Sequence, residues 1–135
     1  MLVNSGAIII ASGGGGIPVV ESRTRELRGV DAVIDKDLAA ERLATALKAE
    51  ELVILTDVPG VFINYRKKDE RLLTKINMKD LDNYAKMGEF ASGSMGPKVE
   101  SALRFIAHGG RRAIIAELDS VDRAIEGIVG TQVLP

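Results

Sequence analysis

The stretch that decides the fold is Val33-Ile34-Asp35-Lys36-Asp37-Leu38-Ala39-Ala40, which sets a lysine between two aspartates where an apolar run meets a predicted helix. We expect the helix to run from about Asp37 to Ala49. Apolar residues recur there every three to four positions and would form one buried face: Ala40, Leu43, Ala44 and Leu47. Asp37 would lie at or next to the N-cap, where a carboxylate accepts backbone N–H bonds and meets the favourable end of the helix dipole. Lys36 is unfavourable there unless an anion is held nearby, so the segment is either a capped helix with a solvated lysine or an anion site.

Length and composition predict one domain with a substantial core and exclude several classes of protein. The 135 residues are 46% hydrophobic, carry a formal net charge of −1 and contain no cysteine. Disulfides and cysteine metal sites are therefore excluded, which fits a reducing, cytoplasmic setting. With no long basic stretch and no apolar run near the length of a membrane helix, we expect neither a nucleic-acid partner nor a membrane partner. The single histidine, His108, is expected to end a helix before Gly109-Gly110, and no metal site is predicted.

Buried strands alternate with amphipathic helices along the chain. Continuous apolar runs predict fully buried strands at residues 7–11, 52–56 and 112–116, with shorter extended pieces at 61–63 and 131–134. Residues 21–36 are expected to form a polar excursion or hairpin, and helices are expected at 78–86, 97–108 and 120–126. This order predicts an α/β fold, a mostly parallel sheet sandwiched by helices, as a single domain over residues 1–135.

Three segments follow strands or begin helices at the sheet edge where ligands bind in such folds. They are the glycine run Gly13-Gly14-Gly15-Gly16, the turn Thr56-Asp57-Val58-Pro59-Gly60 and the helix start Gly93-Ser94-Met95-Gly96-Pro97-Lys98. The glycine run lacks the third glycine of the dinucleotide fingerprint and the Gly-Lys-Ser/Thr of a Walker A loop. It is either an anion cradle or a flexible turn. The mixed-charge cluster at residues 66–71 is expected to be a solvated turn.

Lys98 adds a second lysine at a helix start. Phosphoryl transfer needs cations on the transferring oxygens and a group that holds those cations in place. Asp37 could orient Lys36 and Lys98 through charge-assisted hydrogen bonds. The other interpretation of Lys98 is a simple surface lysine.

Four segments resemble carbamate kinase, a member of the amino-acid kinase superfamily. They are residues 11–19 (ASGGGGIPV), 29–37 (GVDAVIDKD), 55–58 (LTDV) and 93–99 (GSMGPKV), and they occur in the family's order. The glycine run and Ile-Asp-Lys-Asp distinguish carbamate kinase from the related acetylglutamate, aspartate and uridylate kinases. The resemblance implies the C-terminal, nucleotide-binding half of the amino-acid kinase fold.

The same resemblance implies a reversible phosphoryl transfer between ATP and carbamate that gives ADP and carbamoyl phosphate, in arginine metabolism, with Mg²⁺ carried by the nucleotide. Asp37 would organise the site, and Lys36 and Lys98 would stabilise the transferring group. Gly13, Gly14, Gly15 and Gly16 would line the acceptor side. The nucleotide would be bordered by Asp57, Val58, Gly60, Val61, Phe62, Phe90, Ala91, Ser92, Gly93, Met95 and Lys98.

Family members also carry an N-terminal part with further catalytic lysines, which this sequence does not include. Three hypotheses follow: a carbamate kinase half that needs a complementary N-terminal half, a nucleotide-binding module without kinase activity, or a fragment that self-associates through an exposed sheet edge. The resemblance also implies a homodimer.

Overall fold

The computed structural model describes residues 2–90 and 94–135. Its centre is a four-stranded sheet in the order β3-β7-β8-β6, made of β3 (Glu51–Thr56), β7 (Arg112–Glu117), β8 (Thr131–Leu134) and β6 (Lys75–Asn77). The pairs β3–β7 and β6–β8 are parallel, and β7–β8 is antiparallel. The prediction of a mostly parallel sheet is therefore confirmed, with one antiparallel pair inside it.

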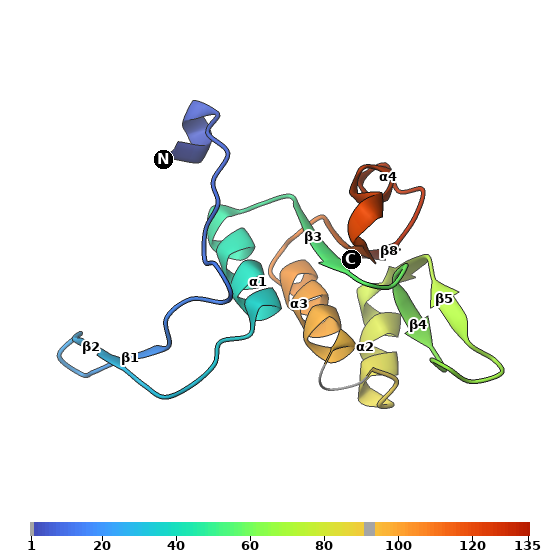
Figure 1. The fold of residues 1–135 in the computed structure, drawn as a ribbon, viewed down its shortest axis with the longest axis horizontal. Coiled ribbons are helices and arrows are strands. Elements are labelled where there is room, and N and C mark those ends of the chain that lie inside the picture. The colour runs from blue at the N-terminus through green and yellow to red at the C-terminus, as the bar shows by residue number, and fades with distance from the viewer. Residues whose placement is uncertain (1, 91–93) are drawn as a thin grey trace.

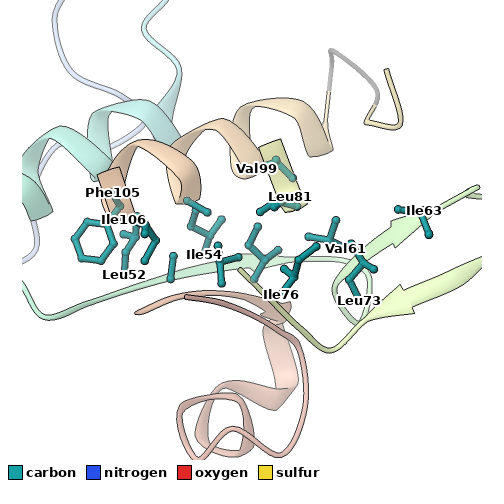
Figure 2. Packing of buried hydrophobic residues seen from close by; sticks show 14 residues of the cluster. Leu52, Ile54, Val61, Ile63, Leu73, Ile76, Leu81, Val99, Phe105 and Ile106 are labelled. Carbon is teal, nitrogen blue, oxygen red and sulfur yellow. The ribbon is translucent and has the colours of Figure 1, made fainter. Parts of the chain in front are cut away.

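Helices cover both faces of this sheet, as predicted. Helices α1 (Lys36–Leu47), α2 (Met78–Lys86) and α3 (Met95–Ala107) lie on one face, and the short α4 (Val121–Ile125) lies on the other (Figures 1 and 2). The predicted range of α2 is confirmed, and α3 begins two residues before the expected Pro97. The remaining elements are η1 (Leu2–Ser5), β1 (Val19–Glu21), β2 (Leu27–Gly29), β4 (Val61–Ile63), β5 (Arg71–Leu73) and η2 (Leu118–Ser120).

The hydrophobic core fills the layer between α2, α3 and the sheet (Figure 2). Phe105 and Val99 of α3 and Leu81 of α2 are at most 1% exposed, and they face strand residues such as Ile54. The inner residues of β7, from Ala113 to Ala116, are fully buried, as expected for a central strand with helices on both sides. This packed body holds α1 and α3 in fixed positions.

The predicted buried strand at residues 7–11 is wrong. No strand forms there, and the side chains of Ile8 and Ile10 are 96% and 98% exposed. A β-branched run becomes a strand only where another strand pairs with it, and no described residue pairs with this one. A hairpin, β1–β2, does form, but over residues 19–29 and not over the predicted 21–36. It extends away from the packed body together with the N-terminal segment (Figure 1).

The predicted buried face of α1 is also wrong. Leu43 and Leu47 are 38% and 42% exposed and Ala40 is exposed, whereas the buried residues of the helix are Asp37 and Glu41. Ala44 is only partly buried. The polar stripe faces inward because its side chains are paired with side chains of α3, which leaves the leucine stripe outward.

Candidate functional site

The N-terminus of α1 is capped by Asp35, not by Asp37 as predicted. One carboxylate oxygen of Asp35 accepts hydrogen bonds from the backbone N–H groups of Asp37 and Leu38, at 2.8 and 3.0 Å. A carboxylate of the chain itself therefore satisfies this helix end. The side chain of Asp37 is left available for another partner.

That partner is Lys98, from the first turn of α3. The Nζ atom of Lys98 donates a hydrogen bond of 2.8 Å to Oδ2 of Asp37, and the two side chains are only 8% and 11% exposed. Lys36 donates to the same oxygen at 3.3 Å but has a side chain that is 62% exposed. The structure thus brings together the three residues predicted for phosphoryl transfer, and one carboxylate oxygen joins both lysines.

The two lysines differ in what they can do chemically. The attraction of Asp37 and its hydrogen bond raise the pKa of Lys36 above the usual 10.5, so Lys36 stays charged over the physiological pH range. Because Lys36 is mostly solvent-exposed, its long side chain can leave Asp37 and reach an anion outside. Lys98 is a buried, fixed charge. The arrangement combines one fixed and one mobile cation around a single organising carboxylate.

A cavity of about 690 Å³ opens beside the start of α3. Residues from the loop after β3, from the β4–β5 loop, from the loop after α2 and from the start of α3 line it. They are Asp57, Val58, Phe62, Tyr65, Arg66, Lys67, Met87, Gly88, Glu89, Phe90, Ser94 and Met95. Its size and its mixture of aromatic, thioether and charged side chains suit a small organic ligand with a charged group.

Five residues predicted to border a nucleotide line this cavity: Asp57, Val58, Phe62, Phe90 and Met95. Two others do not. Val61 is fully buried in the core. Gly60 packs closely against Thr131: a Cβ on it would lie 2.7 Å from Thr131 Oγ1. Ala91, Ser92 and Gly93 lie outside the described residues.

The part of the β4–β5 loop in the cavity was not predicted from the sequence, which indicated a solvated turn at residues 66–71. Tyr65 packs beside Phe62 with ring centroids 5.8 Å apart, and the guanidinium of Arg66 lies 5.3 Å from the centre of the Tyr65 ring. The carboxylate of Glu89 accepts a hydrogen bond of 2.9 Å from the backbone N–H of Asn64, which ties this loop to the end of α2. An aromatic residue inside a charged turn was the one available signal.

The cavity and the lysine pair meet at the N-terminus of α3. Ser94 and Met95 line the cavity, and Lys98 follows Met95 by three residues, about 4.5 Å along a helix axis. The side chain of Ser94 makes no capping hydrogen bond, so the first N–H groups of α3 have no side-chain partner at Ser94. A negatively charged ligand group at this helix end would be attracted by the helix dipole and by Lys98.

The glycine run lies next to the start of α1. A Cβ on Gly15 would be 2.3 Å from the carbonyl oxygen of Ile34, the residue before the capping Asp35. Gly13, Gly14 and Gly16 have open space where a Cβ would be. The run therefore contacts the segment that carries the lysine pair while leaving three backbone positions accessible.

No metal centre of the chain's own is visible in the part that the structure describes: no three His, Asp or Glu side chains gather there at metal-binding distance. In the same residues, no helix has both the length and the apolar character to cross a bilayer.

The chain is similar to carbamate kinases over nearly its whole length. Carbamate kinase from Thermococcus kodakarensis is 56% identical over 133 residues, which are 98% of this chain and 42% of that protein. Carbamate kinase from Pyrococcus horikoshii is 53% identical over 99% of this chain and 42% of its own length. Among solved structures, carbamate kinase from Giardia lamblia bound to AMP-PNP superposes with a TM-score of 0.95 at 43% identity, covering 98% of this chain and 46% of that one.

The chain thus spans less than half the length of these relatives. The profile described as "Amino acid kinase family" matches residues 1–117. With this match, the helix-flanked sheet and the sequence identity to carbamate kinases, the chain belongs to the amino acid kinase family.

Proposed function

We propose that this chain is the nucleotide-binding part of a carbamate kinase-type phosphotransferase, which transfers a phosphoryl group reversibly between ATP and carbamate. One observation carries the proposal: the buried Asp37–Lys98 pair lies one helical turn from a cavity of nucleotide size, at a helix start where the side chain of Ser94 forms no capping hydrogen bond. A solved relative bound to AMP-PNP supports a nucleotide as the ligand. Mg²⁺ carried by the nucleotide belongs to the same proposal.

In this proposal the base would lie between Phe62, Tyr65 and the methionines of the cavity, and the phosphates would point toward the start of α3. Lys98, held by Asp37, would place a fixed positive charge on the transferring phosphoryl group. Lys36 would exchange its contact with Asp37 for a contact with the same group. Asp37 itself would act as the organising group that keeps both cations in place.

The acceptor side would be formed by Gly13 to Gly16, whose accessible backbone can approach an anion closely. We further propose that catalysis requires residues outside this sequence, since the chain spans 42% of its carbamate kinase relatives. They would come from a complementary N-terminal half. A homodimer, a place in arginine metabolism and a cytoplasmic location belong to the same proposal.

Two alternatives remain distinct in their consequences. A nucleotide-binding module without kinase activity would bind MgADP but transfer nothing. A self-associating fragment would neither bind nor transfer, and the exposed Ile8 and Ile10 favour its association.

Calorimetry with MgADP is the first test. We expect saturable binding of MgADP at one site. For MgAMP-PNP, which also carries the third phosphoryl group that Lys98 would contact, we expect a loss of affinity in Lys98→Met of about 1.5–3 kcal/mol, as for a hydrogen bond to a charged group. The matched control is Lys86→Met, an exposed lysine paired with Asp82 and outside the cavity, which should leave the affinity unchanged. The absence of heat at millimolar MgADP, or equal effects of both substitutions, would contradict the proposed site.

ATP formation from MgADP and carbamoyl phosphate is the second test. We expect the chain alone to form ATP no faster than buffer, and addition of the N-terminal half of a carbamate kinase relative to raise the rate. Binding without transfer under either condition would favour the nucleotide-binding module.

A further inference from the structure

A second charged contact joins α1 to α3, away from the Asp37–Lys98 pair. Glu41 is fully buried, and its Oε1 atom accepts a hydrogen bond of 2.8 Å from the hydroxyl of Thr45. The same oxygen lies 3.1 Å from Nδ1 of His108, the residue that ends α3. His108 is half-exposed, with 44% of its side chain in contact with solvent. The contact therefore links a buried carboxylate to a group that solvent can protonate.

The buried carboxyl group of Glu41 has few polar partners. Its second oxygen, Oε2, is buried and forms no hydrogen bond with any described residue, and the same is true of the nearby helix residue Ser101 through its Oγ. A buried carboxylate with one hydroxyl and one imidazole as partners is stabilised far better when the imidazole carries a proton. The strength of the α1–α3 contact at this point thus changes with the protonation of His108.

The two charged contacts are mechanically coupled through the helices. Asp37 and Glu41 are one turn apart on the same face of α1, and Lys98, Ser101 and His108 follow one face of α3. The helices lie side by side and run in the same direction (Figure 1). A shift of Glu41 away from α3 would therefore move Asp37 relative to Lys98.

The other charges around His108 are accounted for. Lys48, at the end of α1, and His108 line a small cavity of about 280 Å³ together with Thr45, Phe105 and the glycines after α3. One turn earlier on α3, Arg104 is paired with Glu100, and after α3 Arg111 is paired with Glu50 and Glu51. Among the described residues, Glu41 is thus the acidic group that contacts the imidazole.

We propose that Glu41 and His108 form a protonation-dependent positioning pair, which seats α1 against α3 and thereby sets the contact between Asp37 and Lys98. Neither residue touches the proposed ligand, so both act through Asp37. When His108 is protonated, it stays in contact with Glu41, and Asp37 keeps its hydrogen bond to Lys98. When His108 loses its proton, the buried charge of Glu41 loses its counter-ion and the contact loosens.

A first experiment tests the pair without any ligand. Because the chain has a single histidine, one set of imidazole NMR signals reports His108. We expect the carboxyl signal of Asp37 to shift together with the His108 signals as the pH changes in the natural chain, but not in Glu41→Gln. An Asp37 signal that does not follow the histidine titration would overturn the proposal.

A second experiment tests the consequence for binding, and it rests on the proposed nucleotide site. MgADP affinity is measured from pH 5.5 to 8.5 for the natural chain, for His108→Gln and for the control Arg104→Gln, which removes an exposed charge of the same helix. We expect His108→Gln to bind roughly fivefold more weakly at pH 5.5, the low end of site-to-site couplings, and equally well at pH 8.5.

Arg104→Gln should show the pH profile of the natural chain, since that residue does not contact Glu41. Parallel profiles for all three proteins would overturn the positioning role. A natural chain that binds no MgADP at any pH would instead contradict the proposed function, while the NMR titration would still decide whether the pair controls Asp37.

Discussion

Asp37 accepts hydrogen bonds from two lysines through one oxygen, and only one of those lysines is buried with it. Because Lys98 is buried and Lys36 is exposed, the two lysines differ in their contribution to folding stability as well as in their mobility. Removing the buried Lys98 leaves Asp37 in a poorly solvated place, with the longer, 3.3 Å contact to the exposed Lys36 ammonium as its remaining ion pair. Removing Lys36 takes away a contact that water already screens.

Lys98→Met should therefore destabilise the fold much more than Lys36→Met. We expect a loss of about 3 kcal/mol in the free energy of unfolding for Lys98→Met, as when one partner of a buried ion pair is removed. For Lys36→Met we expect a loss below about 1 kcal/mol, as for exposed pairs. Urea unfolding followed by circular dichroism measures both. Equal losses would show that the Asp37–Lys98 pair is not buried in solution.

Glu51 gives a separate, pH-dependent prediction. Hydrogen bonding to Arg112, together with the charges of Arg112 and Arg111, lowers the pKa of Glu51 below its usual 4.5. Since the folded pKa lies below the unfolded one, the stabilisation is complete above about pH 4.5 and is lost as the pH falls through the folded value. Glu51→Gln should thus be less stable than the natural chain at pH 6 and approach it at pH 3. A stability difference between the two proteins that is the same at both pH values would contradict this account.

At the scale of elements, the end of α3 depends on two glycines for different reasons. Gly109 has a φ of 95°, with open space where a Cβ would be. A Cβ on Gly110 would lie 2.3 to 2.7 Å from three ring atoms of the buried Phe105. Gly109 permits the left-handed backbone conformation that ends the helix, and Gly110 leaves room for the ring of Phe105 to pack against the backbone.

Gly110→Ala should destabilise the chain by about 1–3 kcal/mol through overpacking against Phe105. The double variant Gly110→Ala/Phe105→Leu should be less destabilised than the sum of the two single variants, because the smaller side chain frees space for the methyl group. Thermal unfolding of the four proteins measures the coupling. Strictly additive effects would show that the close contact is absent.

Elements with a strong local signal could be predicted from the sequence. The range of α2 was predicted from the pattern of residues 78–86. The range of α3 was predicted to within two residues from Pro97 near its start and Gly109 after its end. The inward face of α1 could not be predicted, because Asp37 and Glu41 are buried by partners 61 and 67 residues away. Periodicity alone therefore selected the leucine stripe. The contribution of Tyr65, Arg66 and Glu89 to the cavity could not be predicted for the same reason, because it depends on residues that are distant in the sequence.

At the scale of the whole molecule, many apolar side chains of the N-terminal part of the chain are exposed. They include side chains of the extended N-terminal segment, of the β1–β2 hairpin and of α1: Ile8, Ile10, Ile17, Val20, Leu27, Val33, Leu43 and Leu47. The apolar run at residues 7–11 predicted a buried strand, and the run lacks a partner among the described residues. Exposed apolar surface beside unpaired backbone favours association with another chain.

Ile10→Lys should reduce self-association without affecting folding. Ile10 is 98% exposed, so its replacement should change the free energy of unfolding by less than about 0.5 kcal/mol. Sedimentation velocity over a range of concentrations should show a concentration-dependent mass for the natural chain and a smaller increase for the variant. Identical sedimentation of the two proteins would mean that residues 7–11 do not mediate association.

The central claim is that a nucleotide binds in the cavity at the start of α3, next to the Asp37–Lys98 pair, and amide chemical-shift mapping tests it most directly. On titration with MgADP, we predict shifts concentrated in residues 57–58, 62–67, 87–90 and 94–98. Residues 75–77 and 134, which line a separate cavity along β6, should remain unshifted. Shifts confined to the β6 cavity, or no shifts at millimolar MgADP, would contradict the account.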